Sequence, residues 1–397
     1  MTSDSQGAPP VLPPLVLPEP GLARSEAIVD LGAIRHNIRT LVDRAPSAQV
    51  MGVLKADAYG HGAVPAAHAA LAGGATWLGC AFPSEALAVR AAGITAPLLA
   101  WLLTPGEDLT APVAAGIDLG VSSLALLESA IGAARSVGGS VRIHLEIDTG
   151  LSRGGATVAD WRALVGAAAA AAAEGAVHIA GIWSHFANAD IPGDPSIRSQ
   201  LDVFRAAVAD AAAVGVRPDL LHIANSAAAL TAPSAHFDMV RAGIATYGLS
   251  PSPEVGRAVD LGLIPAMTLQ THVALAKRVP AGSGVSYGHR YRTDRETTLA
   301  LIPLGYADGI PRSATNIGEV QLGGVRRRIA GTVCMDQFIL DVHDDDVAAG
   351  DQVLLFGPGR DGEPTADDWA LALDTIGYEI VTRIGTRTPR TYRPLDA

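Results

Sequence analysis

A lysine in the segment VLKADAYGHG (residues 53–62) is the first side chain whose position suggests covalent chemistry. Lys55 stands at the predicted end of an apolar strand, and a glycine-rich turn into a helix follows it. A buried lysine is more readily neutral, and the neutral amine can form a Schiff base with a carbonyl compound. Because many loops after strands carry a solvated lysine, this position alone leaves both interpretations open.

Other residues with reactive side chains also follow short apolar runs. They are Asp148, Arg153, His185, Asn225, Ser226 and Arg241. Alanine-rich stretches of helical length separate the eight runs, which cover residues 50–55, 77–81, 97–103, 117–122, 141–148, 179–185, 221–225 and 239–245. This alternation predicts an α/β fold with an amino-terminal (β/α)8 TIM-like barrel. Active sites of such barrels lie at the carboxyl ends of the strands, where these reactive residues fall.

The sequence pattern changes after about residue 265. Alternating polar and apolar segments at residues 268–276, 298–303, 325–332 and 338–342 are separated by Gly, Pro and Asp. They predict short antiparallel strands in a second, mainly-β domain at the carboxy terminus. We therefore expect a disordered arm over residues 1–20, the barrel over 21–265 and a β-rich domain over 266–397.

Composition argues against several classes of function. The formal net charge of −11 disfavours a nucleic-acid or anionic-membrane surface. The first 23 residues contain six prolines and no Lys or Arg, and no apolar stretch is long enough to span a bilayer, so neither a signal peptide nor a membrane helix is expected. Cys80 and Cys334 suit reduced thiols in a cytoplasmic protein better than a disulfide framework or a metal site.

The whole ten-residue string around Lys55 resembles the cofactor-lysine signature of the alanine racemases, and the resemblance extends from Arg24 to Arg393. It implies that Lys55 holds pyridoxal 5'-phosphate. It also implies a barrel followed by a β-domain, and a homodimer in which each β-domain completes the partner's active site.

Several motifs in the barrel carry the resemblance further. The string VRAGI (residues 240–244) resembles the motif in which an arginine, here Arg241, meets the pyridine nitrogen, and the backbone of Gly243 and Ile244 holds the phosphate. Three hydroxyls resemble the side-chain ligands of that phosphate: Tyr59, Ser226 and Tyr378. Taken singly, Ser226 is equally an N-cap candidate and Tyr378 equally a core aromatic residue.

Two further barrel strings resemble family motifs. In DTGLSR (residues 148–153), Arg153 would bond the phenolic oxygen of the cofactor and help bind the substrate carboxylate. In SHFANAD (residues 184–190), His185 would bridge Arg241 and a tyrosine. His222 has no such motif, and we interpret it as structural.

The second domain carries the expected second base. The string GVSYG (residues 284–288) resembles the family motif in which a tyrosine, here Tyr287, acts from the other subunit. A phenol with an ordinary pKa of about 10 is a poor base, so it needs a charged neighbour such as the pair of His185 and Arg241. In GTVCMD (residues 331–336), Met335 would meet the substrate carboxylate through its backbone, and GYADGIPR (residues 305–312) would line the approach.

These resemblances imply interconversion of L- and D-alanine, with Lys55 and Tyr287 as bases on opposite faces and D-alanine supplied for peptidoglycan. A racemase of wider specificity, for serine or a longer side chain, is an alternative. A decarboxylase of the same architecture fits less well, because it would pair an acidic residue with the ring nitrogen, where this chain has Arg241. A non-catalytic cofactor carrier would consist of the bare barrel, so the β-domain with its tyrosine motif excludes that class of protein.

The chain departs from the family pattern at Glu146. Relatives commonly have a lysine there, which often carries a carbamate. A glutamate could supply the same negative charge to Arg153 permanently, although its side chain is shorter. Gly154 and Gly155 also follow Arg153 where the common version has one bulkier residue.

Overall fold

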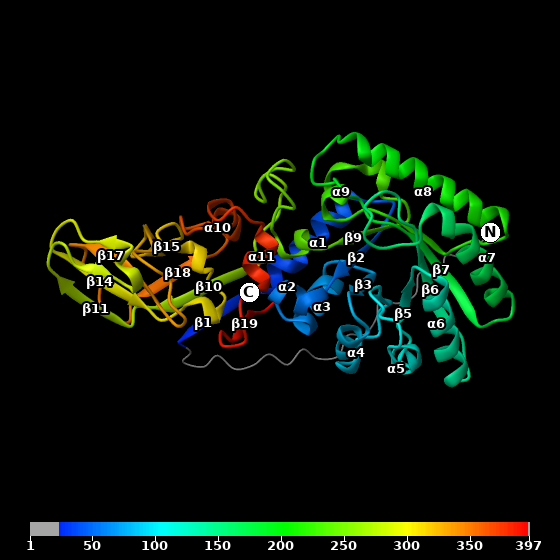
Figure 1. The fold of residues 1–397 in the computed structure, drawn as a ribbon, viewed down its shortest axis with the longest axis horizontal. Coiled ribbons are helices and arrows are strands. Elements are labelled where there is room, and N and C mark those ends of the chain that lie inside the picture. Colours follow the sequence, from blue (N-terminus) through cyan, green and yellow to red (C-terminus); the bar gives the residue numbers. More distant parts are fainter. Residues whose placement is uncertain (1–23, 396–397) are drawn as a thin grey trace. The chain divides into compact units, whose positions relative to one another are not determined.

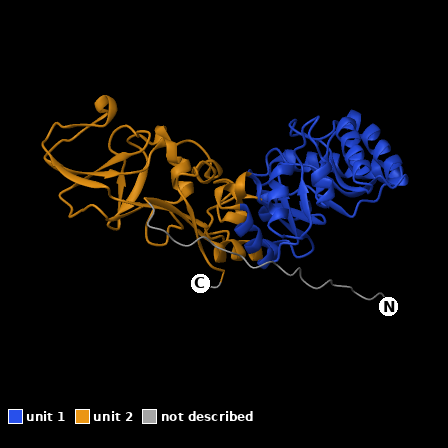
Figure 2. Ribbon diagram, turned by 90° about the horizontal axis from the view of Figure 1, so that it is seen from below, with its two compact units in different colours: residues 1–16, 41–55, 63–242 blue, residues 17–40, 56–62, 243–397 orange. Residues whose placement is uncertain are grey.

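The computed structural model describes residues 24–395, so the arm expected over residues 1–20 lies outside the described part of the chain. These residues form two compact units (Figure 2). The first comprises residues 41–55 and 63–242, and the second comprises residues 24–40, 56–62 and 243–395. Helix α1 (Leu31–Arg44) and the short helical segment α2 (Lys55–Gly60) each contribute residues to both units.

The first unit contains the predicted parallel sheet of eight strands (Figure 1). Its strands are β2 (Gln49–Val53), β3 (Trp77–Cys80), β4 (Leu98–Ala100), β5 (Asp118–Val121), β6 (Val141–Glu146), β7 (Val177–Trp183), β8 (Leu220–His222) and β9 (Met239–Ala242). Their order is β8-β7-β6-β5-β4-β3-β2-β9. Hydrogen bonds from Asp238 N to Leu221 O and from Arg241 N to Ala224 O, both 3.0 Å, join β9 to β8 and close the sheet into a barrel.

Helices follow the strands as the alanine-rich stretches predict. They are α3 (Ala63–Ala72), α4 (Pro83–Ala91), α5 (Thr110–Ala114), α6 (Leu124–Ser136), α7 (Val158–Ala173), α8 (Pro195–Ala213) and α9 (Ser226–Thr231), with a 3-10 turn η1 (Pro233–Ala235). Side chains of Ser123, Thr157 and Asp194 cap the amino ends of α6, α7 and α8 by accepting a backbone hydrogen bond. Among residues 24–395, no helix is long and apolar enough to cross a membrane.

The second unit is mainly β, as predicted. A six-stranded sheet has the order β16-β15-β18-β10-β1-β19, a three-stranded sheet has the order β11-β14-β17, and β12 pairs with β13. The strands are β1 (Ser25–Asp30), β10 (Met267–His272), β11 (Leu275–Val279), β12 (Gly284–Val285), β13 (Tyr291–Arg292), β14 (Thr297–Ile302), β15 (Glu319–Leu322), β16 (Val325–Arg328), β17 (Phe338–His343), β18 (Gln352–Phe356) and β19 (Arg390–Arg393).

Short helical elements complete this unit. They are α10 (Ala366–Ala372), α11 (Gly377–Thr382) and the 3-10 turns η2 (Ile244–Tyr247), η3 (Tyr287–His289), η4 (Tyr306–Asp308) and η5 (Arg312–Ala314).

The segment at residues 268–276 is two strands and not the single strand that its alternation predicts. The chain changes partners between two adjacent residues: Val273 N bonds Asp351 O and Ala274 N bonds Leu301 O, both at 2.8 Å. The residues before this point belong to the six-stranded sheet as β10, and those after it belong to the three-stranded sheet as β11.

Candidate active site

Lys55 directly follows the first barrel strand and opens a turn of unusual handedness. Leu54 N still bonds Gly79 O of β3 at 2.7 Å, and the next four residues after Lys55, Ala56–Tyr59, have φ angles of 54°, 52°, 56° and 55°. Left-handed backbone costs a residue with a Cβ roughly 1–2 kcal/mol. Four consecutive residues in this conformation therefore require tertiary support, which strained segments at functional sites commonly have.

Part of that support comes from His61, which is fully buried in the second unit. Its Nδ1 lies 3.0 Å from the carbonyl oxygens of both Ala58 and Tyr59, and its ring stacks on Tyr247 at 4.5 Å. Arg390 Nε also donates to Gly60 O at 2.9 Å. Burial lowers the pKa of His61 to about 4, so the ring is neutral at physiological pH and donates its Nδ1–H to these carbonyls.

The amine of Lys55 lies in surroundings that favour its neutral form. Burial lowers its pKa, and the positive charges of Arg153 and Arg241 act in the same direction, whereas Glu85 opposes them. A neutral amine is a nucleophile and a base, whereas an ammonium is neither. The barrel therefore places Lys55 within electrostatic range of two arginines, which disfavours its charged form.

Arg241 on β9 is the most extensively bound side chain of this cluster. Its NH1 contacts His222 Nδ1 at 3.1 Å, and its NH2 donates to Ser184 O at 2.8 Å and contacts His185 Nδ1 at 3.1 Å. The guanidinium also lies over the ring of Trp183, 4.8 Å from the centroid. Burial lowers the pKa of Arg241 to about 10, which still leaves it charged at neutral pH.

These contacts fix the protons of both histidines. A guanidinium only donates, so Nδ1 of His185 and Nδ1 of His222 both accept. Burial, and next the charge of Arg241, lower the pKa of each ring well below its ordinary value, so both are neutral and carry their single proton on Nε2. His185 therefore presents an N–H on the side of its ring away from Arg241.

His222 is the partner that the motifs do not identify. It is the last residue of β8, fully buried, and its ring stacks on Trp183 with centroids 5.8 Å apart and planes 8° apart. Our interpretation of His222 as merely structural is therefore incomplete, because its ring holds Arg241. Its position at a strand end, four residues before Ser226, is the sequence signal that could have indicated this.

Arg153 stands in a loop that Asp148 shapes. The Oδ1 atom of Asp148 accepts backbone N–H bonds from Gly150 at 2.9 Å, Leu151 at 3.0 Å and Ser152 at 3.1 Å. Arg153 follows this turn and contributes positive charge that lowers the pKa of both Lys55 and His185. The loop thus brings a guanidinium into electrostatic range of the lysine and the histidine.

Glu146, at the end of β6, places a carboxyl group in this cluster. Burial raises its pKa to about 7, and the charges of Arg241 and Arg153 counteract that rise. Within residues 24–395, no ion pair shorter than 4.0 Å joins Glu146 to Arg153, and the charge of Arg153 acts on the carboxyl group at longer range. Whether this carboxylate positions Arg153 stays a prediction.

Ser226 also lies at the carboxyl end of the barrel. It is the first residue of α9, but the N-cap is Asn225, whose side chain accepts from Ala228 N at 3.0 Å. The alternative of Ser226 as the cap therefore does not hold. The first unit thus brings five of the predicted site residues to one end of the barrel: Lys55, Arg153, His185, Ser226 and Arg241.

The other predicted phosphate ligands lie together in the second unit. The ring of Tyr59 is 5.0 Å from that of Tyr247 and 6.0 Å from that of Tyr378. Burial raises the pKa of Tyr59, which keeps its phenol protonated and able to donate. Gly243 immediately precedes η2, whose first residue is Ile244.

Three motif loops of the second unit join into one exposed surface. Ser286 Oγ donates to Thr332 O at 2.6 Å, and Thr332 Oγ1 donates to Tyr287 O at 2.7 Å. Tyr306 N donates to Cys334 O at 3.0 Å, which attaches the third loop. This surface carries large exposed side chains, with Tyr287 at 74% and Met335 at 52% exposure.

The chain matches known proteins over almost its whole length. Residues 29–251 match the family model for the alanine racemase N-terminal domain, and residues 266–392 match the model for the C-terminal domain. An alanine racemase from Frankia casuarinae is 62% identical over 93% of this chain and 96% of its own length. One from Thermobifida fusca is 59% identical over 93% of this chain and 98% of its own length.

Solved structures agree with the sequence comparison. The crystal structure of alanine racemase from Streptomyces lavendulae has a TM-score of 0.93 and 54% identity, covering 94% of this chain and 98% of that one. The enzyme from Bacillus anthracis, solved with bound L-Ala-P, has a TM-score of 0.87 and 35% identity over 95% of this chain and 96% of that one. The chain therefore belongs to the alanine racemases, isomerases that interconvert L- and D-alanine.

Proposed function

We propose that this alanine racemase works with pyridoxal 5'-phosphate attached to Lys55, and that it supplies D-alanine for peptidoglycan. The observation that carries the proposal is the pair of Lys55 and Arg241 at the carboxyl end of the barrel. Lys55 has the lowered pKa that attack on an aldehyde requires. Both terminal nitrogens of Arg241 are bound, whereas within residues 24–395 its Nε–H has no hydrogen-bond partner and is available to an acceptor such as a pyridine nitrogen.

The chemistry of the predicted donors also suits the phosphate of that cofactor. Ser226, Tyr59 and Tyr378 would supply hydroxyl donors, and the backbone N–H groups of Gly243 and Ile244 would supply two more. A permanently charged Arg241 would keep the ring nitrogen unprotonated, which limits charge delocalisation and disfavours transamination. The bound cofactor would acidify the α-proton of alanine.

The residues of this chain then have distinct tasks. Lys55 would remove or return the α-proton on one face, and Tyr287 would do so on the other. Arg153 and the backbone of Met335 would bind the substrate carboxylate. His185, whose free N–H is on Nε2, would donate to the Tyr287 oxygen and stabilise its ionised form.

We further propose a homodimer in which each subunit donates Tyr287 and Met335 to its partner's site. Both side chains are exposed in the single chain, at 74% and 52%. Neighbouring large apolar groups that are exposed together often mark an interaction surface, which supports a partner subunit here. The joined loops of residues 284–288, 305–312 and 331–336 would form that contribution.

The lysine content of the chain makes the test decisive. The sequence has two lysines, Lys55 and Lys277, and Lys277 is exposed on β11. Borohydride reduction of the protein with pyridoxal phosphate, followed by peptide mass spectrometry, is expected to label Lys55 and leave Lys277 unmodified. Lys55→Ala should lose the label and racemase activity, and Lys277→Ala should retain both. Full racemase activity of Lys55→Ala would overturn the proposal.

Substrate specificity needs a separate assay. The same enzyme preparation should be tested on L-serine and on longer L-amino acids, with release of carbon dioxide measured in parallel. Alanine turnover that exceeds all others, without carbon dioxide, would exclude both the wider-specificity racemase and the decarboxylase.

A further inference from the structure

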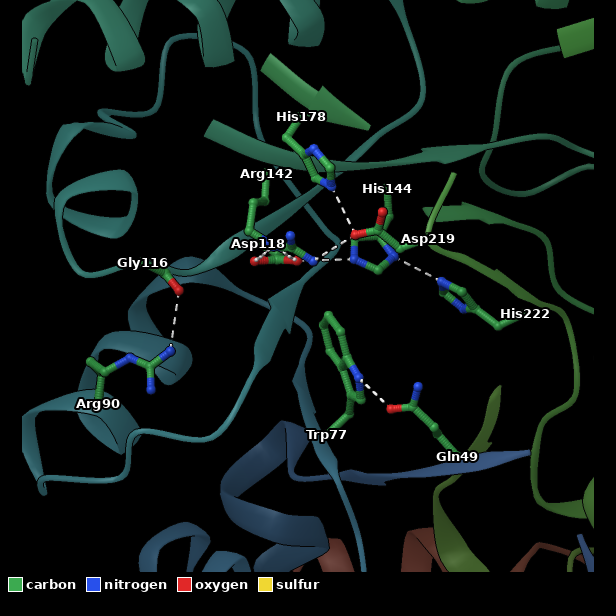
Figure 3. Close-up of polar contacts among 10 residues, drawn as sticks. All are labelled: Gln49, Trp77, Arg90, Gly116, Asp118, Arg142, His144, His178, Asp219 and His222. Atoms are coloured by element: carbon green, nitrogen blue, oxygen red, sulfur yellow. Dashed lines mark hydrogen bonds and ion pairs between the residues drawn. The ribbon is translucent and has the colours of Figure 1, made fainter. Parts of the chain in front are cut away.

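A continuous chain of buried polar side chains crosses the interior of the barrel and ends at Arg241. Asp118 Oδ2 lies 3.1 Å from His144 Nε2, and His144 Nδ1 lies 2.9 Å from His222 Nε2. Figure 3 shows how these three side chains follow one another. His222 Nδ1 then lies 3.1 Å from Arg241 NH1. Four side chains from four different strands are thus joined without interruption.

The chain connects the two ends of the barrel. Asp118 is the first residue of β5, at the amino end of the strands, whereas His222 is the last residue of β8, at the carboxyl end. His144 and His222 are fully buried and Asp118 is 3% exposed. At the amino end, Arg142 Nε donates to Asp118 at 3.1 Å, which balances the carboxylate charge.

One arrangement of protons satisfies every contact. Arg241 donates to His222 Nδ1, so neutral His222 must carry its proton on Nε2 and donate it to His144 Nδ1. His144 must then carry its own proton on Nε2 and donate it to the carboxylate of Asp118. Every hydrogen bond points from Arg241 toward Asp118, and each strengthens the next by polarisation.

The sheet around His144 is built to accept its ring. A Cβ on Gly181 of β7 would lie 2.2 Å from His144 Nδ1, so only glycine fits opposite. The register of β6 against β7 shifts between Ile143 and His144. Trp77 packs edge-on against the His144 ring at 5.4 Å.

We infer that Asp118 and His144 are positioning residues for Arg241: they fix His222 as the Nε2–H tautomer and thereby hold the guanidinium in place. The inference rests on the proposed role of Arg241 at the cofactor's ring nitrogen. If the carboxylate were replaced by an amide, the amide N–H could donate to His144 and reverse both tautomers. His222 would then present an N–H to a guanidinium that can only donate.

The tautomers can be measured in the wild-type enzyme, and one variant serves only to assign the signals. 15N NMR of histidine-labelled enzyme, with and without pyridoxal phosphate, distinguishes Nε2–H from Nδ1–H rings, and His222→Gln assigns its signal by loss. We expect His144 and His222 to be neutral Nε2–H tautomers in both samples. An Nδ1–H or doubly protonated His222 would overturn the inference.

A pair of matched variants tests the effect on the cofactor. Asp118→Asn interrupts the chain, whereas Asp219→Asn removes the other carboxylate on Arg142, at 3.4 Å, without touching His144. Asp118→Asn should raise the Kd for pyridoxal phosphate and lower kcat by roughly tenfold each, which is the scale of one lost charge-assisted hydrogen bond. The KM for alanine should change little. Asp219→Asn should match the wild type.

Lower thermal stability of Asp118→Asn with unchanged cofactor Kd and wild-type tautomers would show a purely structural role and refute the inference. The proposed function would survive that result, because reductive labelling of Lys55 in the wild type tests it independently.

Discussion

The carboxylate of Glu146 lies against the backbone of Gly154, where a Cβ would stand 3.3 Å from Oε1 and 3.4 Å from Oε2. The two departures from the family pattern are therefore in contact. The absence of a side chain at Gly154 leaves room for the carboxylate at the end of β6. When ionised, this carboxylate acts electrostatically on both Arg153 and Arg241.

We expect Glu146→Gln to weaken substrate binding. The substitution keeps the size of the side chain and removes the charge that attracts Arg153, so the KM for alanine should rise and kcat/KM should fall by roughly tenfold. Steady-state racemisation assays in both directions measure this. Wild-type kinetics in the variant would mean that Arg153 is positioned by other groups.

The same substitution should change how the apoenzyme's stability depends on pH. Burial raises the pKa of Glu146 from 4.5 to about 7, so the folded protein holds this proton to higher pH than the unfolded chain does. The contribution of Glu146 to stability is therefore fully present below pH 4.5 and is lost as the pH rises through about 7. Glu146→Gln cannot titrate, so it should gain stability relative to the wild type across this range.

Urea unfolding of both apoproteins at several pH values measures the difference. Glu128→Gln, at an exposed position of α6, is the control and should show no such trend. A difference between Glu146→Gln and the wild type that is constant with pH would contradict the raised pKa.

Gly154→Ala should affect the enzyme through Glu146. The added methyl group is compatible with the backbone but crowds both carboxylate oxygens, so the carboxylate must move. The KM for alanine is expected to rise several-fold, on the order of 1 kcal/mol. Gly166→Ala, on α7 with no atom near its added Cβ, is the control and should keep the wild-type KM. Equal kinetics for the two variants would show that Glu146 tolerates displacement.

The sequence predicts the parts of this molecule that local patterns encode. Eight apolar runs separated by alanine-rich stretches predict the barrel strands, because each unit of strand and helix is defined within about 30 residues. The change of partner between Val273 and Ala274 has no such signal, because the alternation continues through both residues while the receiving strands are far away in sequence.

The row of polar side chains inside the barrel could not be predicted from the sequence for a related reason. His144 and Asp118 each stand singly in an apolar strand, and their contact joins residues 26 positions apart. A lone histidine in a strand is usually a satisfied core residue, so only the closed barrel shows that two histidines and a carboxylate meet. The motif residues could be predicted because each motif is a string of several neighbouring residues, whereas the polar side chains inside the barrel come one from each strand.

The last prediction concerns Tyr287, which is 74% exposed in the single chain. Tyr287→Phe should keep the cofactor and lose racemisation by roughly a hundredfold or more, the contribution of a general acid or base. Exchange of the α-proton with D2O should survive for the enantiomer that Lys55 serves, and proton NMR of each enantiomer measures it. Equal loss of exchange from both enantiomers would contradict the two-base scheme. Tyr291→Phe removes a phenol that bonds Asp341 at 2.8 Å, is the control and should racemise normally.

If each site takes Tyr287 from the partner subunit, mixing Lys55→Ala with Tyr287→Phe subunits restores one intact site in every heterodimer. Random pairing then recovers roughly a quarter of the wild-type activity. No recovery in mixtures that verifiably exchange subunits would place Tyr287 in its own chain's site.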